Sequence, residues 1–473
     1  MFSKIAPKSP EGNLVLAPLR ELGAIRQKNR ELHKEILKMK IIYLITGSGG
    51  SFYCGNCYRD MLYVRAIRKV PGIKATAIPL YLPPAKNNVE TGFDKNVFFG
   101  AISMYLREKV GFLRNMPAIF DKFFDSSLFL RFAARQAGTT STEGYEELTI
   151  NMIEGDNAFR KAEVDRLVKY LLKDGKPDII HLSNALILGI ARQLKKRIDV
   201  KVICSLLNED DWIDDMAEPF RSRAWEMIAR EAGYVDIFVT PSNYYKELFK
   251  SKTKLKCDNV MVVPLGFDPE KDTISRPQRE PSAIGFFSRI NNYNGFDKLV
   301  DAFIEMKKQD LIPKLTLKIC GGYTGTDKNF ISQQIKKIRE HKLEKSVKIY
   351  PEFQGDKKME FFNDVDVMSV PVRKYDGYGL YLLEANAAGI PVVQPATGAF
   401  PEILERTKGG IVYYPDTVSE LASSLHKLLK DRELISSLGE TGRKMVRQEL
   451  SLDKMSAGLS EVYNKTIKNA PCK

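Results

Sequence analysis

Short apolar segments alternate with helix-like stretches along most of the chain, and no other feature limits the fold as strongly. The segments are almost continuously apolar, which is typical of strands buried on both faces of a parallel sheet. The predicted strands are residues 39–46, 74–80, 177–182, 200–205, 234–240 and 260–264, then 283–287, 314–320, 347–350, 365–370, 391–394 and 410–413. Helical stretches such as 161–173 and 186–197 separate them. The pattern predicts an α/β protein with two doubly wound, Rossmann-like domains.

A polar, proline-bearing stretch at residues 268–282 separates the two sets of strands and is predicted to be an interdomain linker. We therefore predict an N-terminal domain at 39–270, a C-terminal domain at 283–450, and a last helix at 451–473 that packs back across both. Residues 1–38 are polar and charged, and we expect them to form an appended extension. Because parallel sheets bind ligands at the carboxyl ends of their strands, the site is expected in the cleft between the domains.

The segment at residues 101–137 interrupts the alternation with aromatic side chains among lysines and arginines. One interpretation is an inserted helical subdomain whose aromatics pack locally. The other is a basic, aromatic face that contacts a membrane or a hydrophobic acceptor. The net charge of +14 favours polyanions or an anionic membrane surface as partners. No recognition-helix or RNA-binding motif is present, so nucleic acid is not expected.

Cysteine and histidine usage argues against a disulfide framework and a metal site. Six cysteines in 473 residues fit a reducing cytoplasm, and only four histidines are available as ligands. Cys54 and Cys57 form a CxxC, which can support redox chemistry or supply half of a zinc site. No second pair has suitable spacing, so we interpret both as structural thiols and expect no metal. No apolar run reaches membrane-spanning length, and no signal peptide is recognised.

The segment at residues 376–385 carries the clearest chemistry. Asp376 precedes Gly377, Tyr378 and Gly379, and an apolar run from Leu380 leads to a second acid, Glu384. A glycine-flanked loop that opens a helix presents backbone N–H groups and the positive end of the helix dipole, which together hold phosphate. Glu384 is expected one turn further in, where a carboxylate can accept two vicinal sugar hydroxyls. The segment predicts a nucleotide-sugar site.

Residues that follow other predicted strands face the same cleft. Arg289 follows the strand that ends at Phe287, where a guanidinium can grip a diphosphate or, alternatively, cap the next helix. Gly321 and Gly322 end the next strand and allow a ligand to approach the backbone. In the first domain, the loop with Gly49 and Gly50 lacks the spacing of a dinucleotide fingerprint and is expected to face the other domain. The segment 208–212 is acidic. Its side chains are suited to bind sugar hydroxyls or to accept a proton from an acceptor, and the alternative interpretation is a helix N-cap with acids in the first turn.

These motifs resemble those of the retaining glycosyltransferases of family 4, which have the GT-B fold. The resemblance covers roughly residues 39–468, is strongest over 283–402, and extends to a little-characterised bacterial subgroup. It implies that Asp376 and Glu384 are the family's two motif acids, that Glu384 holds the ribose, and that Arg289 grips the diphosphate. It makes these three the predicted catalytic residues. The implied donor-binding residues are Ser288, Asn294, Gly321, Gly322, Gly377, Tyr378, Gly379 and Leu380, with the amides of Gly379 and Leu380 meeting phosphate. The implied acceptor-side residues are Gly49, Gly50, Asn208 and Glu209.

The resemblance further implies transfer of a sugar from a nucleotide-diphosphate donor to a glycan or lipid-linked acceptor, with retention and without a metal. Three positions depart from the family pattern. Asp376 is shorter than the usual Glu, Asn294 replaces a usual Lys, and the segment 207–209 lacks a usual His. Loss of the lysine cation weakens diphosphate binding unless Arg373, Lys374 or Lys298 compensates. The alternatives are a non-catalytic sugar-binding or regulatory protein and a nucleotide-sugar epimerase of the same fold.

Overall fold

The computed structural model describes residues 39–46, 53, 55–80, 142–155, 161–255, 259–268, 280–312, 314–374 and 376–468. The predicted extension at 1–38, the predicted insertion at 101–137, most of the predicted linker, Gly49, Gly50 and Cys54 lie outside these ranges.

A parallel six-stranded sheet forms the core of the N-terminal domain, in the order β2-β1-β3-β4-β5-β6. Its strands are β1 (Met39–Ile45), β2 (Ile73–Pro79), β3 (Ile179–Leu182), β4 (Lys201–Ser205), β5 (Ile237–Thr240) and β6 (Val260–Val262). Its helices are α2 (Gly55–Lys69), α6 (Glu146–Glu154), α7 (Lys161–Leu172), α8 (Gly189–Ile198), α9 (Glu209–Ile213), α10 (Phe220–Glu231) and α11 (Asn243–Thr253). Nearly every residue of β3, β4 and β5 is buried, because helices cover both faces of the sheet.

A second parallel six-stranded sheet forms the C-terminal domain, in the order β12-β11-β10-β7-β8-β9. Its strands are β7 (Ala283–Phe287), β8 (Thr316–Cys320), β9 (Val347–Tyr350), β10 (Val367–Met368), β11 (Val392–Pro395) and β12 (Gly410–Tyr413). Its helices are α12 (Phe296–Lys308), α13 (Lys328–Glu340), α14 (Gly355–Asn363), α15 (Leu380–Ala387), α16 (Phe400–Thr407), α17 (Val418–Leu429) and α18 (Arg432–Glu449). The prediction of two doubly wound α/β domains is confirmed.

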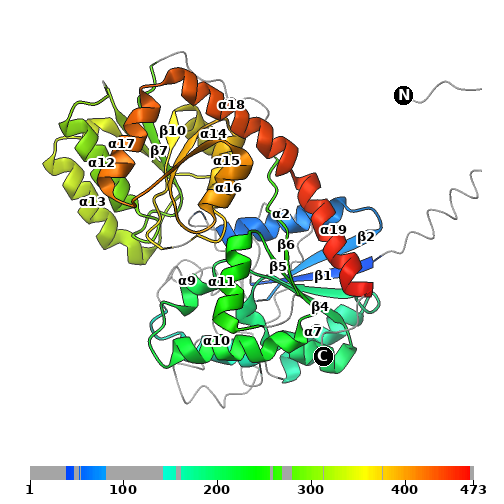
Figure 1. Cartoon of the computed structure of the whole chain (residues 1–473). Helices are drawn as coiled ribbons and strands as arrows, with labels where there is room; N and C mark the ends of the chain where they lie inside the picture. Colours follow the sequence, from blue (N-terminus) through cyan, green and yellow to red (C-terminus); the bar gives the residue numbers. More distant parts are fainter. Residues whose placement is uncertain are drawn as a thin grey trace, which may run out of the picture.

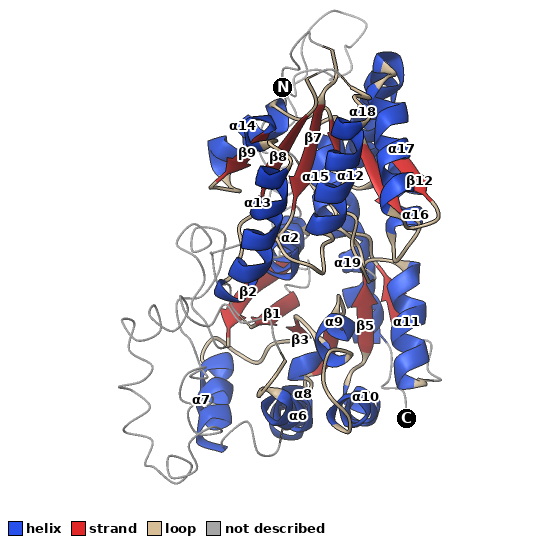
Figure 2. Ribbon diagram, turned by 90° about the vertical axis from the view of Figure 1, so that its left-hand side faces the viewer, coloured by secondary structure: helices blue, strands red, loops and turns tan. Residues whose placement is uncertain are grey.

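The two domains lie one above the other (Figures 1 and 2), and the last helix joins them. α19 (Leu452–Lys468) continues from α18 of the C-terminal domain and packs against α2 of the N-terminal domain. Its Tyr463 hydroxyl lies 3.0 Å from His181 Nδ1 in β3. Within the described ranges, no helix is long and apolar enough to cross a membrane.

Candidate functional site

Loops from both sheets line a cavity of about 380 Å³ between the domains. Asn184 follows β3, Asn208 follows β4 and Arg289 follows β7, so these side chains lie at the carboxyl ends of their strands. The start of α15 contributes Leu380 from the C-terminal domain, and the start of α2 contributes Asn56 from the N-terminal domain. In the C-terminal sheet, β7 is the strand at which the order reverses, the usual position of a ligand site in an open α/β sheet.

The cavity brings together many of the predicted site residues. Those in its lining are Ser288, Arg289, Asn294, Asp376, Gly379, Leu380, Asn208 and Glu209. Glu384, Gly321, Gly322, Gly377 and Tyr378 lie outside the lining. Gly49 and Gly50 lie outside the described residues.

Asp376 is bound to the turn that precedes α15. Its Oδ1 accepts hydrogen bonds from the backbone N–H groups of Tyr378 (2.9 Å) and Gly379 (2.8 Å). Its Oδ2 accepts one from the Tyr381 hydroxyl (3.0 Å). The short Asp side chain therefore folds back onto its own loop, as Asp commonly does in turns. The Gly379 amide, expected to meet phosphate, donates to Asp376 in this arrangement.

Gly377 is held by the opposite domain. Its N–H donates to Asn208 Oδ1 (2.8 Å), and its carbonyl accepts from Ser242 Oγ (2.7 Å). A Cβ atom at Gly377 would lie 2.5 Å from Asn208 Oδ1, so a larger residue would force the side chains packed against it to shift. Asn208, predicted to lie on the acceptor side, lines the cavity, and its side-chain carbonyl oxygen also anchors the loop that carries Asp376.

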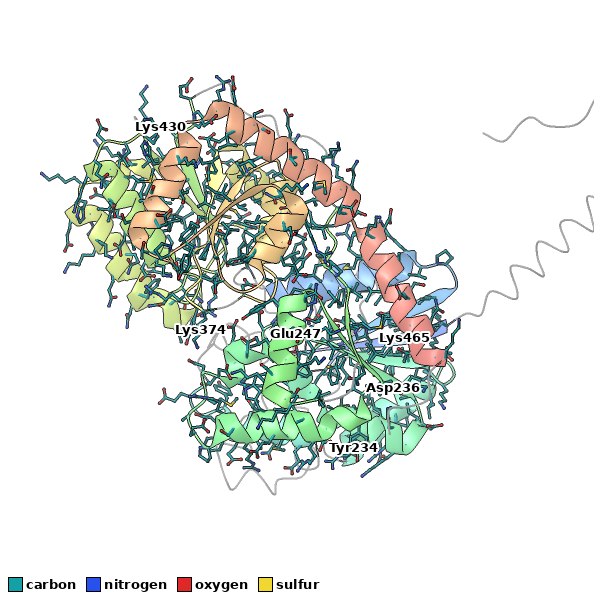
Figure 3. The ribbon with its side chains drawn as sticks, viewed as in Figure 1. Tyr234, Asp236, Glu247, Lys374, Lys430 and Lys465 are labelled. Carbon is teal, nitrogen blue, oxygen red and sulfur yellow. The ribbon has the colours of Figure 1, made fainter. Side chains whose placement is uncertain are left out.

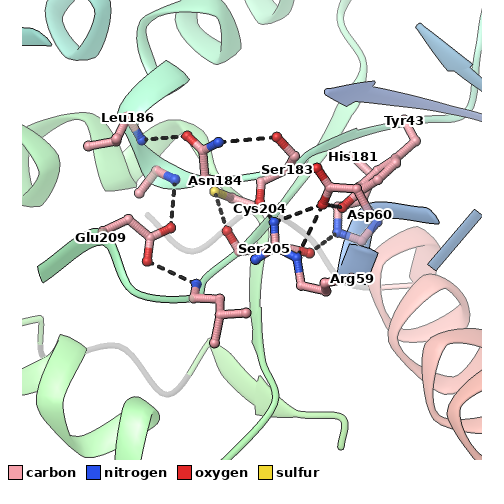
Figure 4. A network of polar contacts seen from close by, with 12 residues as sticks. Tyr43, Arg59, Asp60, His181, Ser183, Asn184, Leu186, Cys204, Ser205 and Glu209 are labelled. Atoms are coloured by element: carbon pink, nitrogen blue, oxygen red, sulfur yellow. Dashed lines mark hydrogen bonds and ion pairs between the residues drawn. The ribbon is translucent and has the colours of Figure 1, made fainter. Parts of the chain in front are cut away.

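Glu209 has a structural position in the first turn of α9. Its Oε1 accepts the Ala185 N–H (3.1 Å), and its Oε2 accepts the Leu207 N–H (2.9 Å), the two dashed lines at Glu209 in Figure 4. Oε2 also accepts the Tyr245 hydroxyl (2.7 Å). Only 2% of the residue is exposed, and burial raises the pKa of its carboxyl. Asn208, at the N-cap of α9, makes no capping hydrogen bond with its side chain, and the amides that Glu209 binds lie before α9.

Arg289 is buried and oriented by an acid that the sequence did not single out. Its Nε and Nη2 donate to Asp327 Oδ2 (3.0 Å) and Oδ1 (2.9 Å), and Nη2 also donates to Thr324 Oγ1 (2.9 Å). A bidentate pair of this kind fixes the plane of the guanidinium. Asn294 Nδ2 donates to the Arg289 carbonyl (2.8 Å), so Asn294 holds the backbone that carries the arginine.

Gly321 allows the ends of β7 and β8 to approach each other closely. Its φ is +137°, and a Cβ atom there would lie 1.9 Å from the carbonyl oxygen of Ser288. Close packing alone therefore requires a glycine at position 321, independently of any ligand contact.

Glu384 is 2% exposed, and each of its carboxylate oxygens has a partner. Oε1 accepts a hydrogen bond from the hydroxyl of Tyr53 (2.8 Å), and Oε2 accepts one from Lys358 Nζ (3.0 Å). Tyr53 precedes α2 of the N-terminal domain and Lys358 belongs to α14. Sequence reasoning connected neither residue with Glu384, because Tyr53 is 331 residues away along the chain and Lys358 belongs to no motif.

All three cations that could compensate for the missing lysine are paired with acids. Arg373 forms an ion pair with Asp297, and Lys298 Nζ lies 2.6 Å from Asp416. Lys374, labelled in Figure 3, lies 4.0 Å from Asp215 of the N-terminal domain. Lys358 is a further cation of the C-terminal domain, and it is paired with Glu384.

Acids at the start of α9 give the N-terminal wall a negative charge. Asp211 lines the cavity and is exposed. Burial raises the pKa of Asp210 to about 6. No group of three or more His, Cys, Asp or Glu side chains suited to a metal ion occurs in the part of the chain that the structure describes.

Comparison with known proteins supports this architecture. The family model "Glycosyl transferases group 1" matches residues 268–445, and "Glycosyltransferase Family 4" matches residues 136–271. A D-inositol 3-phosphate glycosyltransferase of Corynebacterium jeikeium is 28% identical over 193 residues, 38% of this chain and 46% of the relative. A GDP-mannose-dependent phosphatidylinositol monomannoside mannosyltransferase of Mycobacterium tuberculosis is 32% identical over 102 residues, 20% of this chain and 26% of the relative. The chain thus spans about half or less of the length of these curated relatives.

Two solved structures show the same fold at low sequence identity. Anabaena HepE, solved with UDP and glucose, superposes with a TM-score of 0.65 at 14% identity, covering 90% of this chain and 100% of HepE. Sucrose-phosphate synthase of Thermosynechococcus elongatus has a TM-score of 0.64 at 16% identity, covering 90% of this chain and 98% of the synthase. The two family models adjoin, and the two facing sheets agree with them: the chain is similar to the family-4 glycosyltransferases and has the GT-B fold.

Proposed function

We propose that the protein transfers a sugar from a nucleotide-diphosphate sugar to a glycan or lipid-linked acceptor, with retention of anomeric configuration. The observation that carries the proposal is the cavity that Arg289 of the C-terminal domain lines together with Asn184 and Asp211 of the N-terminal domain. HepE was solved with UDP and glucose, and the mannosyltransferase relative is named for GDP-mannose, which supports a nucleotide-sugar donor.

The proposed chemistry relies on stabilising the leaving diphosphate. Arg289, held in plane by Asp327, supplies a fixed positive charge, and the N-terminus of α15 adds the positive end of a helix dipole. Because these groups meet the developing charge, we propose that the reaction needs no metal. The hydroxyl of the acceptor would enter from the N-terminal wall, on the same face of the sugar that the diphosphate leaves.

We place the protein in the cytoplasm, with peripheral contact at an anionic membrane surface. The small number of cysteines supports a reducing compartment, and the net charge of +14 supports attraction to anionic lipid. Flotation with anionic vesicles at low and high salt tests this part; binding that is absent at low salt contradicts it.

The experiment is a donor panel of UDP-glucose, UDP-galactose, UDP-N-acetylglucosamine and GDP-mannose. Thermal shift reports binding, because a ligand that binds the folded state raises stability with the logarithm of its concentration over Kd. Release of nucleoside diphosphate reports turnover, and NMR of the product's anomeric proton reports retention. Arg289→Ala is expected to lower turnover about 100-fold or more, as when one transition-state donor is removed. Lys430→Ala removes an exposed cation at the end of α17, and is the matched control.

A non-catalytic sugar-binding protein is the second candidate. The observation that favours it is that Arg289, Glu384 and Asn294 are all engaged with protein partners. A thermal shift with a donor but no turnover in any acceptor mixture would support this candidate. Turnover that Arg289→Ala abolishes would exclude it, and no response to any donor would contradict both.

A further inference from the structure

Tyr53 belongs to the N-terminal domain but makes its contacts with the C-terminal domain. Its backbone N–H donates to the carbonyl of Gly321 at the end of β8 (2.7 Å). Its ring packs on Phe287 at the end of β7, with centroids 4.9 Å apart. Its hydroxyl donates to Glu384 in α15 (2.8 Å). The residue is 8% exposed. Its backbone, its ring and its hydroxyl each contact the C-terminal domain.

The hydroxyl of Tyr53 is protonated and donates its hydrogen bond to Glu384. Burial, followed by the negative charge of Glu384, raises the pKa of Tyr53 well above its usual value, so the phenol keeps its proton at neutral pH. Lys358 binds the other carboxylate oxygen of Glu384, with a side chain that is 12% exposed. A hydrogen bond to an ionised carboxylate is stronger than one between neutral groups.

A ribose hydroxyl bound to Glu384 would need Oε1, the atom that accepts the hydrogen bond of the Tyr53 hydroxyl. The proposed function takes up the role that the family resemblance implies for Glu384, whose carboxylate accepts the two vicinal hydroxyls of the donor's ribose. Tyr53, which donates to Oε1 of Glu384, lines the cavity, whereas Glu384 itself does not. Tyr53 presents a hydroxyl donor at the edge of a flat apolar ring, beside the strand ends where the nucleotide would lie. The phenol and a ribose hydroxyl therefore compete for Glu384 Oε1.

We propose that Tyr53 is a built-in competitor of the nucleotide, seated on the ribose-binding carboxylate until the donor displaces it. The inference rests on the proposed function and adds regulation of the same site. Displacement of Tyr53 also breaks the hydrogen bond from its backbone N–H to the Gly321 carbonyl. Tyr53 lies two residues before Gly55, the first residue of α2 and part of the cavity lining.

The test is isothermal titration of the full chain with UDP and, in parallel, GDP. Tyr53→Phe keeps the ring on Phe287 and removes only the competing hydroxyl. Its Kd for the nucleotide is expected to fall about tenfold, the usual worth of one hydrogen bond to a charged group. Tyr414→Phe is the control, because Tyr414 is 81% exposed and lies outside the cavity lining.

A double-mutant cycle assigns the effect to Glu384. In the Glu384→Gln background, Tyr53→Phe is expected to change the nucleotide Kd less than threefold, since the charged acceptor for which both compete is gone. A Tyr53→Phe protein that binds nucleotide no more tightly than the wild type overturns the inference and leaves the proposed function standing. If neither the wild type, Tyr53→Phe nor Tyr53→Ala binds UDP or GDP, the proposed function itself fails.

Discussion

At the residue scale, the adjacent acids Glu209 and Asp210 in α9 differ in how many hydrogen bonds their carboxylates accept. Glu209 accepts hydrogen bonds from the backbone of Ala185 and Leu207 and from the Tyr245 hydroxyl. Asp210 is 7% exposed, and its Oδ1 has no hydrogen-bond partner among the described residues. Desolvation is the largest cause of the raised pKa of Asp210, and the neighbouring charges of Glu209 and Asp214 add to it. Asp210 is therefore a source of instability when it is ionised.

Asp210→Asn is expected to stabilise the protein at neutral pH. The folded-state pKa of Asp210 is about 6 against 3.8 for the model carboxyl, so the folded state binds the proton more tightly. Ionisation of Asp210 lowers the free energy of unfolding by its full amount above pH 6, and by less as the pH falls towards 4. We expect the free energy of unfolding to rise by about 2–3 kcal/mol at pH 7.5 and by about 1 kcal/mol at pH 4.5. Denaturant titrations at both pH values check this, and an equal gain at both would contradict it.

At the element scale, a buried polar contact joins the last helix to the first sheet. His181 in β3 is fully buried, with Nε2 2.8 Å from Ser205 Oγ and Nδ1 3.0 Å from the Tyr463 hydroxyl of α19. Burial, aided by the nearby charge of Arg59, lowers the pKa of His181 to about 3, so the ring is neutral in the folded protein. The contact ties α19 to the strand that carries Asn184 to the cavity.

Tyr463→Phe is expected to destabilise the protein by about 1–2 kcal/mol, because it leaves a buried imidazole nitrogen without its partner. The free energy of unfolding at pH 7.5 measures the effect. Tyr414→Phe is the matched control, since Tyr414 is 81% exposed and its hydroxyl faces solvent. Equal stability of the two variants would show that the contact with His181 contributes nothing.

The strands were predictable from the sequence, whereas the contacts within the site were not. The predicted segment 283–287 coincides with β7, because a strand that is buried on both faces has a continuously apolar sequence. The predicted segment 410–413 coincides with β12, an edge strand that is only partly buried. The predicted strand at 260–264 ends earlier, at Val262, near Pro264, which has no N–H for the ladder. Tyr53 and Glu384 are separated by 331 residues, and only the docking of two domains brings them together. No local pattern encodes such a pair.

At the scale of the whole molecule, the domains meet through the loop before α15. A Cβ atom on Gly377 would lie 2.5 Å from Asn208 Oδ1, 2.8 Å from Leu207 Cδ1 and 2.9 Å from Tyr245 Cδ2, all in the N-terminal domain. Gly377→Ala is therefore expected to separate the domains and to cost about 1–3 kcal/mol, the usual effect of overpacking. Small-angle scattering should show a larger radius of gyration. Gly233→Ala is the control, because a Cβ atom there meets nothing within 4 Å.

In a second contact between the domains, an acid from α16 caps the N-terminus of α11. Glu402 Oε2 accepts the backbone N–H groups of Asn243 (2.8 Å) and Tyr244 (3.2 Å), and Oε1 accepts Asn243 Nδ2 (3.0 Å). A carboxylate at a helix N-terminus satisfies orphan donors and complements the helix dipole, which is worth about 1–2 kcal/mol. Here the capping acid comes from the opposite domain, so its contribution stabilises the arrangement of the domains as well as the helix.

Glu402→Ala should therefore act on domain docking more than on either domain alone. We expect the free energy of unfolding to fall by about 1–2 kcal/mol, with a smaller difference at high salt, since salt screens the charge–dipole part. Glu405→Ala, on the exposed side of the same helix, is the control. Limited proteolysis gives an independent measure, because separated domains expose the segments between them to cleavage. If Glu402→Ala matches Glu405→Ala in unfolding and proteolysis, the cap does not hold the domains together, and the loop at Gly377 would have to do so without it.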